Sequence, residues 1–370
     1  MTGTGHWVAR RAERAERRAG GRFAHLRGWA LAAVAFSALG ATGCGEDEPT
    51  PAVVDAAPVD AGLDMEPDAG EPSVDERCPE AQAGTYLLVL YPDRVEAWRQ
   101  RQGQFGATYM CEFLALGANG ITNATGLVRG RTGDRHFYVT SPEATEGAIY
   151  AFDEGGAFVG KVMNNINLQG VAGIWPTAGD DYVAYSGTSQ NLYRLNADFQ
   201  FRGPASLPQL PGAQLPGLVD LVYNDATSAV AVFSDRSPRL FKDPFSPEWA
   251  ANELGAGGAV TLVDTEEGAK VLIAARLGAG AGTGVVLHEA INSGRTPPPR
   301  ETVLVPAGEI EDAASLVIVD TGFFVLDRGP AEGPGRIHGF NGIGVRQSNV
   351  ALRGTERPLR MLRESIFSRF

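Results

Sequence analysis

The cysteines carry the most distinctive chemistry in this chain, and their positions assign them different roles. Three occur in the 370 residues, at Cys44, Cys78 and Cys111. Cys44 ends an ordered run of a basic segment up to Arg27, an apolar segment over 29–39 and small residues over 40–43. This order is typical of an export signal, and the apolar segment is shorter than the roughly 20 residues that a transmembrane helix needs. We therefore expect residues 1–43 to be removed and the remainder to act outside the cytosol.

The residues around Cys44 resemble a bacterial lipoprotein signal peptide, although Ala41 stands where that family most often has Leu. The resemblance implies that Cys44 is lipidated and becomes the mature N-terminus. It also implies a membrane-anchored protein of the bacterial cell envelope, facing the periplasm or the cell surface. The resemblance does not decide between the inner and the outer membrane. The alternative is an ordinary secretory signal that is cleaved near Ala41 and leaves Cys44 as a free thiol.

Residues 44–77 have the composition of a tether. They contain eleven acidic residues and no aromatic residue, and they repeat short Asp-Ala phrases. Such a segment buries too little apolar area to offset the entropy of ordering it, and its charges repel one another. We expect a disordered acidic spacer between the membrane and a domain at 78–370.

The charge balance excludes some partners. The chain has a formal net charge of −12, and its first 43 residues carry seven Arg against two Glu, so residues 44–370 have a net charge of −17. The tether's eleven acids and one Arg leave −7 on the domain. An acidic domain lacks the basic face that nucleic acid or an anionic membrane surface would require.

Cys78 and Cys111 form an even pair in a compartment that is oxidising. A disulfide between them is therefore expected, tying the start of the domain to its first repeat. The alternative is two unpaired buried thiols.

Familiar catalytic motifs are missing or incomplete. The run 155–161 resembles a P-loop, but the next residue is Val162 rather than Ser or Thr, and the glycine-rich run 278–284 lacks dinucleotide-loop spacing. The sequence has no Gly-x-Ser-x-Gly elbow, no HExxH motif and no EF-hand loop. We expect no nucleotide ligand. The domain's histidines, His136, His288 and His338, fall at different places in the repeat, so we expect surface or packing roles for them.

From about residue 79 the chain repeats short apolar strands separated by Gly, Asp, Asn and Pro. Six marker runs start 51, 45, 47, 42 and 52 residues apart, at 86–91, 137–141, 182–186, 229–234, 271–275 and 323–327. Apolar runs also precede and follow most markers, for example 218–223 before the fourth and 147–152 after the second. A strand-rich period of about 40–50 residues predicts the four-stranded blades of a β-propeller.

The first marker run has no strand before it, whereas residues 356–370 are left over at the C-terminus. We expect this tail to supply the missing inner strand and close the ring, which removes exposed sheet edges. The predicted fold is thus all-β, a propeller of six blades with four antiparallel strands each, closed by the C-terminal strand. Five or seven blades, or a pair of β-sandwiches, are the alternatives.

The phrase Phe137-Tyr-Val-Thr-Ser141, followed by Gly147-Ala-Ile-Tyr-Ala-Phe152 and Asp153-Glu-Gly-Gly156, resembles the repeats of the NHL, YVTN and SMP-30/gluconolactonase-like β-propellers. The lactonase-type members hold calcium with carboxylate and carboxamide oxygens at one mouth of the channel. The resemblance implies ligand candidates near the starts of inner strands, namely Asn123, Asn164, Asn165, Asn167 and Asp220. The alternative is that these are turn-forming polar residues.

These observations predict a lipid-anchored propeller that acts as a non-catalytic binding or scaffold module for a protein, peptide or glycan partner, without a cofactor. The competing class is a metal-dependent, lactonase-type hydrolase with its site at the channel mouth. A third class is a purely structural envelope lipoprotein. An enzyme would bring at least three of the candidate ligands to one point, whereas a binding module would show an apolar or aromatic patch on one face.

Overall fold

A computed structural model describes most of the domain: residues 74–101, 105–131, 136–205, 214–225, 228–242, 249–250, 254–265, 268–278, 282–289 and 301–366. The expected signal peptide, the lipidation site Cys44 and the tether up to residue 73 lie outside these residues. Within them, no helix is both long and apolar enough to cross a membrane.

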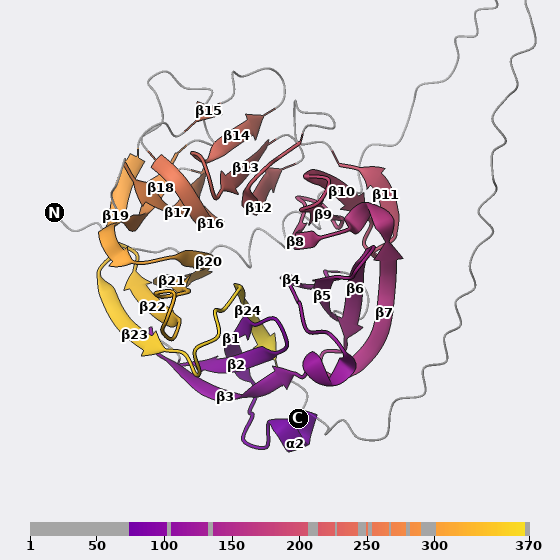
Figure 1. The fold of residues 1–370 in the computed structure, drawn as a ribbon. Coiled ribbons are helices and arrows are strands. Elements are labelled where there is room, and N and C mark those ends of the chain that lie inside the picture. The colour runs from indigo at the N-terminus through magenta and orange to yellow at the C-terminus, as the bar shows by residue number, and fades with distance from the viewer. Residues whose placement is uncertain are drawn as a thin grey trace, which may run out of the picture. The chain divides into compact units, whose positions relative to one another are not determined.

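The described strands form six four-stranded antiparallel sheets arranged in a ring (Figure 1). We call the region that the inner strands surround the channel. We number these sheets blades 1–6 and give their strands from the inner to the outer one. Blade 1 has β24 (Arg360–Ile366), β1 (Gly84–Leu90), β2 (Val95–Gln100) and β3 (Ala107–Leu114). Blade 2 has β4 (Gly126–Arg129), β5 (Phe137–Pro142), β6 (Gly147–Phe152) and β7 (Phe158–Asn165). Blade 3 has β8 (Val171–Pro176), β9 (Tyr182–Ser186), β10 (Asn191–Leu195) and β11 (Phe201–Pro204).

Blade 4 has β12 (Leu218–Asp225), β13 (Ser228–Phe233), β14 (Arg239–Lys242) and β15 (Trp249–Ala250). Blade 5 has β16 (Leu254–Thr265), β17 (Gly268–Leu277), β18 (Thr283–His288) and β19 (Glu301–Ile310). Blade 6 has β20 (Ala313–Val319), β21 (Gly322–Asp327), β22 (Arg336–Asn341) and β23 (Arg346–Ala351). Each of the six marker runs is the second strand of its blade, as the period predicts.

The C-terminal strand closes the ring. β24 pairs with β1 along its whole length, from Gly84 opposite Ile366 to Leu90 opposite Arg360. Each inner strand also contacts the next one around the ring, including β20 with β24 and β24 with β4. The prediction of six blades closed by the C-terminal strand is confirmed.

Blade-to-blade packing explains why the second strands are apolar on both sides. Alternate residues of a strand face opposite sides of the sheet, and each blade here lies between two others. Leu88 packs with residues of blades 1 and 2, whereas Leu87 packs with residues of blades 6 and 1. At the first of these interfaces the rings of Phe113 and Phe137 meet edge to face with centroids 5.2 Å apart. The outer strands instead tend to alternate between half-buried and exposed residues, as β7 does, because one side of the strand faces solvent.

The start of the domain is fixed to blade 1. Cys78 and Cys111 form the expected disulfide, which joins the chain entry to β3. The short helix α2 (Val74–Arg77) comprises the last four residues of the segment expected to be tether. Arg77 donates hydrogen bonds to the carbonyls of Phe113 (3.3 Å) and Gly156 (3.2 Å). The docked part of the chain therefore begins before Cys78.

Candidate functional site: the channel around Asp220

Propeller topology brings the metal-ligand candidates to one end of the blades. We call this end the entry face, because the inner strands begin there. Asn123 lies in the loop before β4, Asn165 ends β7, Asn167 lies in the 3₁₀ turn η2 (Ile166–Leu168) before β8, and Asp220 lies in the first half of β12. Asn164 precedes Asn165 on β7, so all five candidates share a face of the ring, although they belong to different blade junctions.

The asparagines contact one another locally. The side-chain oxygen of Asn165 accepts hydrogen bonds from the backbone N–H (2.9 Å) and the side-chain amide (3.0 Å) of Asn167. Asn165 therefore caps the turn η2, a common role for asparagine. The side-chain amide of Asn164 donates to Glu146, and Asn123 is exposed.

Asp220 has a different environment. Its side chain is buried, and its carboxylate accepts hydrogen bonds from four N–H donors on four blades. These are Trp175 Nε1 (2.7 Å) from blade 3, the backbone N–H of Leu221 (3.0 Å) from blade 4, the backbone N–H of Val260 (2.8 Å) from blade 5, and Arg360 Nη2 (3.2 Å) from blade 1. Three of these donors, from Trp175, Leu221 and Arg360, reach Oδ1, whereas the N–H of Val260 reaches Oδ2. A cation at Oδ1 would have to displace donors that are already in place.

Arg360 reaches Asp220 across the channel. In a ring of six blades, blade 1 lies opposite blade 4, so this ion pair joins opposite sides of the propeller. The Arg360 guanidinium carbon also lies 5.5 Å from the centre of the Trp175 ring, a cation–π contact. The Arg360 side chain retains 21% of its exposure, against 5% for Asp220. The channel thus contains a charged bridge.

The loop before β24 is held on both sides, which positions Arg360. On one side, Arg94 of blade 1 forms an ion pair with Glu356 of this loop. Arg94 also pairs with Asp93 and Glu96 of its own blade. On the other side, Arg357 of the loop binds Asp312, which precedes β20 of blade 6, at 2.6 Å. Contacts from blade 1 and from blade 6 therefore fix the position of the loop that leads into β24.

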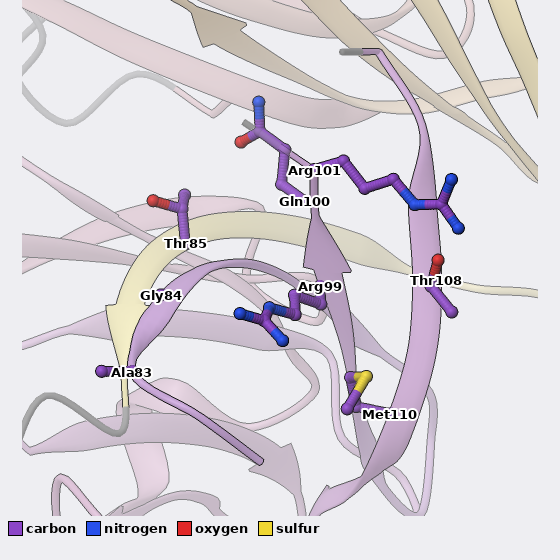
Figure 2. A pocket seen from close by; sticks show the side chains of 8 residues that line it. All are labelled: Ala83, Gly84, Thr85, Arg99, Gln100, Arg101, Thr108 and Met110. Atoms are coloured by element: carbon purple, nitrogen blue, oxygen red, sulfur yellow. The ribbon is translucent and has the colours of Figure 1, made fainter. Parts of the chain in front are cut away.

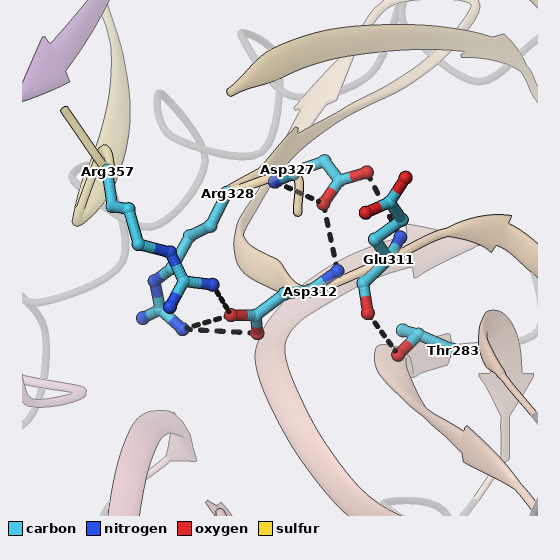
Figure 3. Close-up of polar contacts among 7 residues, drawn as sticks. Thr283, Glu311, Asp312, Asp327, Arg328 and Arg357 are labelled. Atoms are coloured by element: carbon cyan, nitrogen blue, oxygen red, sulfur yellow. Dashed lines mark hydrogen bonds and ion pairs between the residues drawn. The ribbon is translucent and has the colours of Figure 1, made fainter. Parts of the chain in front are cut away.

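Asp312 is in turn positioned by Asp327, the last residue of β21 (Figure 3). The buried carboxylate of Asp327 accepts from the backbone N–H groups of Glu311 (3.1 Å), Asp312 (2.9 Å) and Gly329 (2.9 Å), and lies 3.2 Å from His338 Nε2. Burial raises the pKa of Asp327, but these hydrogen bonds outweigh it and lower the pKa to about 2. The ionised carboxylate thereby holds the turn that presents Asp312 to Arg357.

The three histidines of the domain lie apart, on blades 2, 5 and 6. His288 and His338 are buried, and His136 is half-buried. Burial lowers the pKa of His288 to about 4, so this side chain is neutral at pH 7 although its Nε2 lies 3.1 Å from Glu301 Oε1. Among the residues that the structure describes, no group of three or more His, Cys, Asp and Glu side chains is placed to hold a metal ion.

Sequence reasoning named Asp220 but missed the residues that act on it. Trp175 and Arg360 lie 45 and 140 residues from it in the chain. Their positions within the repeat could have identified them. Asp220, Trp175 and Arg360 all lie on inner strands, and inner strands face the channel.

Comparison with known proteins gives the fold. No protein-family model and no curated protein matches the chain. A chain in the crystal structure of a nidogen/laminin complex is 12% identical over 77% of this chain and 99% of its own length, with a TM-score of 0.57. A Bacteroides fragilis protein assigned as a 6-phosphogluconolactonase is 11% identical over 80% of this chain and 100% of its own length, with a TM-score of 0.50. Identities this low carry a shared fold and no function.

The pKa of Asp327 predicts an acid-sensitive step in stability. The folded value of about 2 lies below the ordinary 3.8, so the contribution is complete above about pH 4 and is lost as the pH falls toward 2. Asp327→Asn should destabilise the domain by about 2 kcal/mol at pH 6, with the deficit shrinking below pH 4. Urea unfolding of both proteins between pH 6 and pH 2.5 measures this difference. Asp198→Asn, at an exposed aspartate, is the control and should cost little. An Asp327→Asn deficit that stays constant with pH would refute the assignment.

Proposed function

We propose that this protein is a lipid-anchored propeller of the bacterial cell envelope that acts as a non-catalytic binding module for a protein partner. One observation carries the proposal. Asp220, the acidic candidate at the channel mouth, is engaged by four N–H donors, one of which is the cross-channel Arg360. Its role is then to hold the blades together, which leaves the faces of a rigid disc for recognition.

An exposed aliphatic patch supports a protein partner. Val303 on β19 and Ile343 and Val345 in the β22–β23 turn are 55%, 74% and 51% exposed. Gly344 brings the turn against blade 5, because a Cβ at this residue would lie 2.0 Å from the carbonyl oxygen of Leu304, and its φ of +81° also favours glycine. Exposed aliphatic side chains that cluster in this way are typical of protein contact sites.

Two of the structures similar to this chain illustrate both uses of such a fold. One is a chain of a nidogen/laminin complex, and the other is assigned as a 6-phosphogluconolactonase. The lactonase-type reading requires oxygen ligands that converge on a cation. Asn165 and Asn167 bind each other instead, and both oxygens of Asp220 accept hydrogen bonds from N–H donors of the blades. These contacts favour the binding module.

A calcium titration separates the two classes. After treatment with EDTA, the full chain should show no change in melting temperature when calcium is added to about 5 mM. A native-state site with a Kd of about 50 μM would instead stabilise the fold by about 2.7 kcal/mol, which is a rise of roughly 5–10 °C. Magnesium at the same concentration controls for ionic strength. A calcium-specific rise that EDTA reverses would overturn the non-catalytic proposal.

The anchor is tested separately with Cys44→Ser in the native bacterium. The wild-type chain should incorporate labelled fatty acid and sediment with membranes, because a diacylated cysteine anchors stably. The variant should lose the label and enter the soluble fraction of the envelope. A variant that stays labelled and membrane-bound would rule out Cys44 as the lipid site.

A further inference from the structure

A cleft opens on blade 1 at the end of the ring away from the entry face. It lies where β1 and β3 begin and β2 ends, and its volume is about 540 Å³ (Figure 2). The polar or flexible side chains that line it are those of Thr85, Arg99, Gln100, Arg101, Thr108 and Met110. This volume falls in the range of about 300–1,000 Å³ that is usual for small-molecule sites.

Strand register brings the basic residues together. Arg99 on β2 lies opposite Tyr86 on β1 and opposite Thr108 on β3. Arg101 follows directly after β2, which ends at Gln100. In Figure 2 the Arg99 guanidinium extends toward β1 near Gly84, whereas Arg101 extends over β3 toward Thr108. The cleft therefore has a guanidinium on either side.

The charge of the cleft is opposite to that of the domain. No Asp or Glu lines it, although the domain as a whole is acidic. Arg99 donates to the side-chain oxygen of Gln82 at 3.1 Å, and Gln100 accepts from Arg363 Nε at 3.0 Å. Within the described ranges, neither Arg99 nor Arg101 has a carboxylate ion-pair partner.

Nine other described arginines do form an ion pair with a carboxylate. They are Arg94, Arg129, Arg194, Arg236, Arg328, Arg346, Arg357, Arg360 and Arg363. Two neighbouring guanidiniums without one leave a local excess of positive charge. Guanidinium donors match the oxygens of phosphate and carboxylate groups, and nearby hydroxyls can complete such a site.

We propose that this cleft binds a small anionic molecule through a phosphate group. Arg99 and Arg101 supply the positive charge, Thr85 and Thr108 supply hydroxyl donors, and Met110 contacts the apolar body of the ligand. The site is additional to the protein-binding role proposed above and does not depend on it. A soluble phosphate compound and a phospholipid headgroup share this chemistry, so the test has one arm for each.

In the first arm, isothermal titration calorimetry measures binding of inorganic phosphate to the full chain at constant ionic strength. The wild type should show saturable binding, and Arg99→Gln/Arg101→Gln should weaken it roughly tenfold or more, because charge-assisted hydrogen bonds are lost. Thr108→Glu places a carboxylate opposite Arg99 and should abolish binding while both arginines remain. Arg336→Gln, at an exposed arginine on the entry face, is the matched control and should bind like the wild type.

In the second arm, the same proteins are sedimented with phosphatidylglycerol vesicles and with phosphatidylcholine vesicles. If the protein binds anionic vesicles and this binding needs Arg99 and Arg101, the phospholipid headgroup is the source of the phosphate. If the arginine substitutions weaken only the binding of inorganic phosphate, the ligand is a soluble compound. Unchanged melting temperatures of the variants establish that the fold is intact. No binding in either arm, or equal binding by wild type and Thr108→Glu, would overturn the proposal.

Discussion

The carboxylate of Asp220 imposes the main constraint on this ring. It is buried in the channel, and a buried carboxylate without donors costs several kcal/mol. Its four donors come from β8, β12, β16 and β24, so they assemble only when blades 1, 3, 4 and 5 are all in place. Arg360 is the last of these donors in the sequence, and it lies on β24, the strand that closes the ring.

Closure thus has two components, one made of backbone and one of charge. The backbone component is the seven-residue pairing of β24 with β1. The charged component is a chain of contacts on the entry face. Asp327 fixes the turn at Asp312, Asp312 binds Arg357, and Arg357 lies three residues before Arg360. Because each contact orients the next, the polar groups here act as a connected network, in which losses are not additive.

The sequence predicted the architecture well because its signals are local. Apolar runs such as 137–141 and 323–327 recur at a nearly fixed period, and the lack of a strand before the first run pointed to β24. The Cys78–Cys111 disulfide followed from cysteine number and compartment. The site was less accessible. Asp220 was identified as a candidate, but its partnership with Arg360 depends on six blades bringing residues 140 positions apart to opposite sides of one channel. Arg99 and Arg101 look like ordinary surface arginines in the sequence, because the cleft forms only when β1 and β3 flank β2.

The measurement that tests the central claim most directly is a double-mutant cycle on Asp220→Asn and Arg360→Met, read by urea unfolding of each protein. If the cross-channel pair holds the ring, the coupling free energy should be about 1–3 kcal/mol, since one partner is buried and the other mostly so. The exposed pair Arg194 and Asp181, cycled in the same way, should couple by no more than about 0.5 kcal/mol. A coupling between Asp220 and Arg360 as small as that of the exposed pair would contradict the account.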